Sequence, residues 1–106
     1  MIVDDERVIR EGLSMIITDF DDSYKVSAQV ANGCEALEMM LSDTPDIVIT
    51  DIKMPRMDGI ELIKCLQETF PDVKKVVLSG FDEFDYVRES MKNGVLCGIE
   101  RGGRHD

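Results

Sequence analysis

Carboxylates follow two of the short apolar runs in this sequence. Asp4 and Asp5 come directly after residues 1–3, and Asp51 ends a run that begins at Asp46. An apolar, β-branched run bounded by polar residues and proline favours a strand that is covered on both faces, as in a parallel sheet. If the two runs form neighbouring strands, their carboxylates converge at the sheet edge where ligands collect in open α/β folds.

Such a cluster indicates a particular chemistry. Carboxylates crowded in a partly dry cleft repel each other unless one is protonated or a cation binds. Oxygen ligands with room for water and a phosphate suit Mg²⁺, which makes Asp4, Asp5 and Asp51 candidate metal ligands. Asp51 is then a candidate nucleophile toward phosphorus, because the cation offsets the charge on the phosphoryl oxygens. Ser79 ends the next apolar run and offers a hydroxyl that can hydrogen-bond the phosphoryl group.

Each of these residues also has a plain structural interpretation. The acid pair at Asp4 and Asp5 is favourable charge at a helix N-terminus, and Asp51 can be a strand-terminal turn residue. Ser79 followed by glycine is an ordinary turn dipeptide. His105 is the single histidine and lies in a polar tail, so we do not expect it to be a ligand. Only the joint convergence of the carboxylates favours the chemical interpretation.

The elements that must position these residues alternate along the chain. Strands are expected at residues 1–3, 25–31, 46–51, 75–78 and 95–99. Helices are expected after the acid pair, after Asn32 with Glu35 as a capping box, after Asp58 with Glu61 as another, and from Asp82. This alternation predicts an α/β fold, a doubly wound parallel sheet with helices on both faces.

Helical periodicity predicts which side chains of these helices face the core. In the first helix the stripe comprises Val8, Ile9, Leu13, Ile16, Ile17 and Phe20. In the second helix it comprises Ala36, Leu37, Met40 and Leu41, and in the third Ile60, Ile63, Leu66 and Phe70.

Composition limits the kinds of protein to which this site can belong. The chain has 106 residues, 43% of them hydrophobic, which is enough for one domain with a core. Its formal net charge of -10 argues against direct binding to nucleic acid. No apolar run approaches the roughly 20 residues of a membrane span. The three cysteines form no CxxC pair, which favours free thiols in a reducing compartment. A cytoplasmic protein without a membrane partner is expected.

Several motifs occur together in a fixed order. They are Val3-Asp4-Asp5-Glu6, the stretch from Asp46 through Asp51 to Met54-Pro55, Met57-Asp58-Gly59, Val77-Leu78-Ser79-Gly80 and Asp82-Glu83-Phe84-Asp85. Together they resemble the receiver domain of two-component response regulators, in register from Ile2 to about Val95. Residues 79–84 and 92–95 are most similar to receivers that precede an AraC-type DNA-binding domain.

The resemblance has specific implications. It implies a flavodoxin-like sheet of strand order 2-1-3-4-5. It also implies transfer of a phosphoryl group from a sensor histidine kinase to Asp51, with the main-chain carbonyl of Lys53 as a further Mg²⁺ ligand. A receiver of this kind is not an enzyme with an external substrate, because it catalyses only its own phosphorylation and dephosphorylation. The partners implied are the kinase and a DNA-binding output domain outside these 106 residues.

The sequence also departs from the family pattern at both ends. Only three residues precede the acid pair here, so we expect a first strand shorter than the family's. In the last expected strand and turn, Gly98 stands where receivers have an aromatic residue, Arg101 where they have the phosphate-binding lysine, and Gly102 where they have proline. We expect no fifth helix within these 106 residues. We therefore expect a receiver domain over residues 1–99, a polar tail at residues 100–106, and a monomer.

Two other functions remain open from the sequence. One is a degenerate receiver that acts as a non-switching binding module. The other is a phosphate-ester hydrolase with an aspartate nucleophile, although such haloacid-dehalogenase-type enzymes carry a second aspartate two residues after the nucleophile, where this chain has Lys53.

Overall fold

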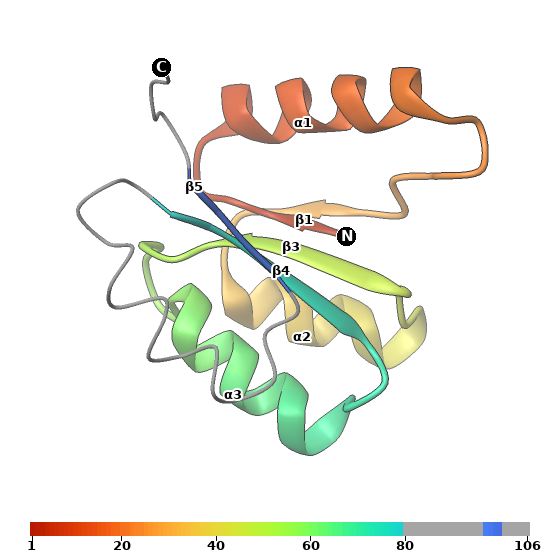
Figure 1. Ribbon diagram of the computed structural model, residues 1–106. Coiled ribbons are helices and arrows are strands. Elements are labelled where there is room, and N and C mark those ends of the chain that lie inside the picture. Colours follow the sequence, from red (N-terminus) through yellow and green to blue (C-terminus); the bar gives the residue numbers. More distant parts are fainter. Residues whose placement is uncertain (80–96, 101–106) are drawn as a thin grey trace.

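Five parallel strands form the sheet at the centre of the molecule (Figure 1). The computed structural model describes residues 1–79 and 97–100, with side chains for residues 1–78. The strands are β1 (Ile2–Val3), β2 (Gln29–Val30), β3 (Ile47–Asp51), β4 (Lys74–Ser79) and β5 (Cys97–Glu100), in the order β2-β1-β3-β4-β5. Both the doubly wound class and the predicted strand order are confirmed. The carboxyl ends of all five strands therefore lie at one edge.

Helices cover the two faces of the sheet unequally (Figure 1). The described helices are α1 (Arg7–Phe20), α2 (Gly33–Ser42) and α3 (Gly59–Thr69). In Figure 1, α1 lies on one face of the sheet, whereas α2 and α3 lie on the other. The predicted fourth helix from Asp82 and most of the predicted tail lie outside the described residues. No helix in the described part of the chain is long and apolar enough to cross a membrane.

Local capping explains where two of the helices begin. The Asp58 side chain accepts the Glu61 N–H at 2.9 Å, and the Glu61 carboxylate accepts the Asp58 N–H at 3.1 Å, which is the predicted capping box. Asn32 likewise accepts the Glu35 N–H at 3.0 Å. The Glu35 carboxylate, however, accepts the N–H of Ala31 rather than that of Asn32. Only one of the two hydrogen bonds of the second predicted capping box is therefore formed.

The hydrophobic core lies mainly between the sheet and the pair α2 and α3. Of the predicted side chains, Ile60, Ile63 and Leu66 are buried as expected, whereas Phe70 is only half-buried. Leu62 was not predicted to face inward but is fully buried as well. The reason is that α3 packs on both the sheet and α2, so it buries a wider arc than a single stripe.

The predictions for α1 and α2 are wrong in part, because Val8, Ile16 and Phe20 are exposed whereas Ile9, Leu13 and Ile17 are half-buried. No residue of α1 is fully buried, and Val8 and Phe20 remain 79% and 78% exposed. Among the described residues, no second helix lies beside α1 on its face of the sheet (Figure 1). Leu41, predicted to face the core from α2, is also 79% exposed. An apolar stripe is buried only where another element covers it.

The strand predicted at residues 25–31 is shorter than expected. Its ladder is limited to Gln29 and Val30, which pair with Ile2 and Val3. Among the described strands β2 pairs with β1 alone, so it cannot pair beyond the residues that β1 supplies. The length of β1 therefore limits that of β2.

Candidate functional site

Strand register brings Asp4 and Asp51 together. In the parallel pairing of β1 with β3, Ile2 aligns with Ile49 and Val3 with Thr50. Continuing this register by one residue places Asp4 beside Asp51 at the carboxyl edge of the sheet. Both residues are buried, with 0% and 4% of their surface exposed. Two buried acids on adjacent strands are unfavourable unless a cation or hydrogen bonds compensate for their charge.

The main chain holds one oxygen of each of these carboxylates. Asp4 Oδ1 accepts the Glu6 N–H at 2.8 Å, and Asp51 Oδ1 accepts the Ile52 N–H at 2.8 Å. A hydrogen bond from a neighbouring N–H favours the ionised form of a carboxylate and fixes its orientation. Both acids are therefore positioned by local backbone geometry.

A cluster of three acids lies where the sheet meets α1. Carboxylate oxygens of Asp4, Asp5 and Glu6 lie within 4.8 Å of one another, with Asp4 buried and the other two exposed. Glu6 was not predicted as a ligand, although the unbroken acidic run in the sequence was a visible signal. Arg10, which was also not predicted, donates to the Asp4 carbonyl at 2.7 Å. An all-oxygen donor set open to water on one side fits Mg²⁺.

The main chain around Asp51 is packed tightly against the start of α3. The Thr50 hydroxyl, fully buried, donates to the Asp51 carbonyl at 2.8 Å. The Gly59 N–H donates to the Ile52 carbonyl at 2.7 Å, and a Cβ at Gly59 would lie only 2.0 Å from the Asp51 carbonyl oxygen. Gly59 therefore lets the first turn of α3 approach the end of β3.

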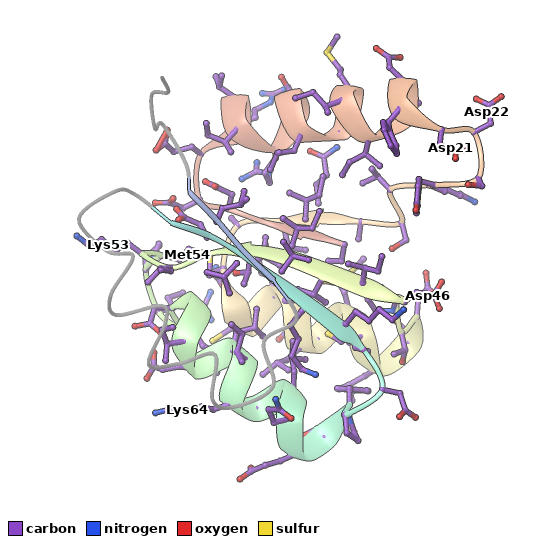
Figure 2. All side chains as sticks on the ribbon, in the orientation of Figure 1. Asp21, Asp22, Asp46, Lys53, Met54 and Lys64 are labelled. Carbon is purple, nitrogen blue, oxygen red and sulfur yellow. The ribbon has the colours of Figure 1, made fainter. Side chains whose placement is uncertain are left out.

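The loop between β3 and α3 carries the predicted carbonyl ligand. Lys53 lies two residues after Asp51, and its exposed side chain points away from the sheet (Figure 2). Arg56 has a φ of 69°, the left-handed conformation that is unfavourable for residues with a Cβ. The Met57 carbonyl accepts the Gly33 N–H at 3.2 Å, which ties the loop to the start of α2.

The remaining predicted residues lie near or beyond the limit of the described chain. In the pairing of β3 with β4, Asp51 aligns with Leu78, so Ser79 comes one residue later at the same edge. Ser79 in turn aligns with Glu100 of β5. The backbone of Ser79 is described but its side chain is not, and Arg101 lies outside the described residues.

A profile of the response regulator receiver domain matches residues 1–100. The chain belongs to this family. The resemblance drawn from the acid pair, Asp51 and the Met-Pro loop is therefore confirmed.

Curated relatives of this receiver are regulators of transcription. It is 46% identical over 95 residues to YesN of Bacillus subtilis (strain 168), an uncharacterized transcriptional regulatory protein, covering 90% of this chain and 26% of YesN. It is 38% identical over 96 residues to the transcriptional regulatory protein HptR of Staphylococcus aureus (strain NCTC 8325 / PS 47), covering 91% of this chain and 37% of HptR. The receiver thus spans roughly a quarter to a third of these relatives.

Solved structures agree with the sequence relatives. The REC domain of AraT, a response regulator from Geobacillus stearothermophilus, matches with a TM-score of 0.85 at 36% identity, covering 95% of this chain and 78% of that chain. The response regulator domain of Thermotoga maritima CheB matches with a TM-score of 0.85 at 30% identity, covering 95% of this chain and 75% of that chain. Both likenesses extend over nearly the whole receiver.

Proposed function

We propose that this receiver accepts a phosphoryl group on Asp51 from a sensor histidine kinase, in a reaction that requires Mg²⁺. The observation that carries the proposal is the register that places buried Asp4 beside buried Asp51, with one oxygen of each held by a main-chain N–H. Membership of the receiver family supports it.

Residues of the site would both bind the cation and accept the phosphoryl group. Asp4, Asp5 and Asp51, with the carbonyl of Lys53, would hold the cation, and exposed Glu6 lies in one carboxylate cluster with Asp4 and Asp5. Bound Mg²⁺ supplies charge neutralisation at the phosphoryl oxygens. An oxygen of Asp51 forms the new bond to phosphorus while the bond from phosphorus to the kinase imidazole nitrogen breaks, and that nitrogen keeps the electron pair. Because Oδ1 is held by the Ile52 N–H, the Asp51 carboxylate is oriented before the phosphodonor arrives.

The later steps of the proposal concern residues near the end of the described chain. Ser79 would hydrogen-bond the phosphoryl group, and Arg101 would meet it from the position that receivers give to lysine. A guanidinium is a wider, planar donor than an ammonium, so we expect it to bind the phosphoryl group in a different geometry.

We also propose how the receiver acts in the cell. The phosphoryl group is transferred to the receiver's own Asp51, so the receiver is a signalling module rather than an enzyme with an external substrate. We place this module in the cytoplasm. Because its relatives are named as transcriptional regulatory proteins, we propose that a separate DNA-binding output domain would make the contact with DNA. The net charge of -10 makes the receiver itself unsuited to that contact.

Labelling with a small phosphodonor tests the proposal. Acetyl phosphate with Mg²⁺ should add one phosphoryl group, detected as a mass increase of the intact chain. Asp51→Asn and added EDTA should each abolish the increase. Modification that persists in either control refutes the assignment, and continuous release of phosphate would indicate a hydrolase instead.

Thermal melting tests the cation site separately. Asp5→Asn removes one charge from the cluster, so it should raise the melting temperature without Mg²⁺ and remove the further rise that Mg²⁺ gives the parent. That further rise corresponds to about 2.7 kcal/mol at a Mg²⁺ concentration one hundred times Kd. Asp22→Asn is the matched control, because Asp22 lies beyond the far end of α1 (Figure 2). A parent whose melting is indifferent to millimolar Mg²⁺ would contradict the site.

A further inference from the structure

The side chain of Arg10 connects α1 to the end of β1. Its Nη1 donates to the Asp4 carbonyl at 2.7 Å, and the residue is half-buried. The other side-chain hydrogen bonds of α1, those of Arg7 and Thr18, stay within the helix. Arg10 is therefore the residue of α1 whose side chain binds the strand that leads into the acidic cluster.

This hydrogen bond takes the place of a bond in the sheet. The Asp4 N–H donates to the Val30 carbonyl at 3.1 Å, which continues the pairing of β1 with β2. The next bond of the same parallel ladder would join the Asn32 N–H to the Asp4 carbonyl. The chain turns into α2 at Asn32, and no such bond is found among the described residues. The guanidinium of Arg10 supplies the donor to that carbonyl instead.

Arg10 holds the turn between β1 and α1 at both of its ends. Its side chain binds the carbonyl of Asp4, and its own N–H donates to the Glu6 carbonyl at 3.1 Å. The Glu6 N–H in turn donates to Asp4 Oδ1 at 2.8 Å. Asp5 lies between these two residues, so the three consecutive acids belong to a loop that Arg10 closes.

The guanidinium holds this loop without binding its carboxylates. In the part of the chain that the structure describes, Arg7 forms an ion pair with Glu11 at 2.9 Å, whereas Arg10 forms none. A guanidinium bound to a carboxylate would compete with a metal ion for the same oxygens. Because Arg10 binds a main-chain carbonyl, it fixes the position of the acids and does not occupy their oxygens.

We propose that Arg10 is a positioning residue for the acidic cluster. By holding residues 4–6 at both ends, it keeps Asp5 and Glu6 beside Asp4, where the three carboxylates lie within 4.8 Å of one another. The inference rests on the proposed function, because this arrangement is the one that binds Mg²⁺ there. Residues that orient metal ligands without touching the metal typically change metal affinity by roughly 10–100-fold.

Three variants and the parent provide the test. Arg10→Met keeps a long side chain of similar helix propensity but has no donor, whereas Arg10→Lys keeps a charge and a donor. Arg7→Met is the matched control, because it removes the same charge from the same helix, and the Arg7 side chain is 80% exposed. Mg²⁺ is titrated into each chain, and Kd is obtained from the amide chemical shifts of Asp5 and Ile52. No residue of α1 is fully buried, so each variant should stay folded, which thermal melting without Mg²⁺ verifies.

The two methionine variants should change Kd in opposite directions. Removing a positive charge near the acids favours a cation by simple electrostatics, so Arg7→Met should bind Mg²⁺ at least as tightly as the parent. Arg10→Met removes the same charge but should bind Mg²⁺ roughly tenfold more weakly than the parent, because the acids are no longer held together. Arg10→Lys should recover most of the lost affinity, since one donor is enough for one carbonyl.

The outcomes separate the role of Arg10 from the cation site itself. If the parent binds Mg²⁺ and Arg10→Met binds it as tightly as Arg7→Met, Arg10 is only a nearby charge and the proposal is overturned. It is also overturned if Arg10→Lys binds no better than Arg10→Met. A parent whose amide shifts do not respond to millimolar Mg²⁺ would refute the cation site of the proposed function, and the role of Arg10 with it.

Discussion

Replacing Gly59 with alanine should be severely destabilising, for a reason that can be worked out from distances. The new Cβ would lie 2.0 Å from the Asp51 carbonyl oxygen and 3.0 Å from both the Asp51 carbonyl carbon and Ile52 Cα. All three atoms belong to the main chain of β3 and the residue after it, so no side-chain rotation relieves the contact. The start of α3 must move away from β3.

The size of this movement sets the expected cost. Ordinary van der Waals contact begins near 3.4 Å, so the 2.0 Å contact must open by 1.4 Å. The same shift would lengthen the 2.7 Å hydrogen bond from Gly59 N–H to the Ile52 carbonyl until it is lost. Overpacking costs about 1–3 kcal/mol and the lost bond about 1 kcal/mol, against a gain of less than about 1 kcal/mol in helix propensity. We expect a net loss of about 3 kcal/mol.

Two other glycines are matched controls. A Cβ at Gly33 would meet Met57 side-chain atoms at 2.7–3.0 Å, and because that side chain is flexible, Gly33→Ala should cost only about 1 kcal/mol. A Cβ at Gly12 would meet nothing within 4 Å. Since Gly12 lies inside α1, Gly12→Ala should stabilise the chain by about 0.5–1 kcal/mol.

Urea denaturation of the three variants gives the ranking directly. The free energy of unfolding should follow the order Gly12→Ala, parent, Gly33→Ala, Gly59→Ala, from highest to lowest. A second readout is phosphoryl labelling of Asp51, which should slow in Gly59→Ala because the Asp51 main chain shifts. If Gly59→Ala unfolds at the same urea concentration as Gly33→Ala, the close approach of α3 to β3 is not a constraint and the reasoning is refuted.

Three further predictions concern other parts of the chain. Asn32→Ala should lower the free energy of unfolding by about 1 kcal/mol because the Glu35 N–H loses its cap, whereas Asn32→Asp, which keeps an acceptor, should not. Arg56→Gly should raise stability by up to about 1 kcal/mol, because glycine adopts the left-handed φ without strain, and Arg56→Ala should show no such gain in urea denaturation. Burial lowers the pKa of the Met1 amino group from 8.0, so the unfolded chain binds this proton first. The free energy of unfolding should therefore fall as pH drops from 8.0 toward the lowered pKa, and acetylation of the Met1 amine should abolish this dependence.

Local signals in the sequence predicted the parts of the fold that depend on neighbours in the chain. The caps at Asn32 and Asp58 were predictable because donor and acceptor lie three residues apart. The position of Asp51 at a strand end was predictable from the apolar run before it. The site residues therefore came largely from motifs whose spacing is fixed by the backbone.

Features that depend on distant elements were not predictable. The exposure of Phe20 depends on which element covers α1, and no periodicity contains that information. The need for glycine at position 59 arises only when α3 meets β3. The role of the Thr50 hydroxyl, which holds the Asp51 carbonyl, is likewise hidden in an apolar run where threonine is an ordinary strand residue.

The uneven burial of the helices divides the four acids of the site, Asp4, Asp5, Glu6 and Asp51, into two pairs of different rigidity. Asp4 directly follows β1 and Asp51 ends β3, and both residues are buried. Asp5 and Glu6 are exposed and lie directly before α1, the helix that buries none of its residues fully. Segments with few buried contacts open locally at lower free energy than the rest of a protein. A cation that binds all of these carboxylates must therefore hold Asp5 and Glu6 in place against Asp4 and Asp51. Its observed affinity will then include the free-energy cost of ordering the start of α1.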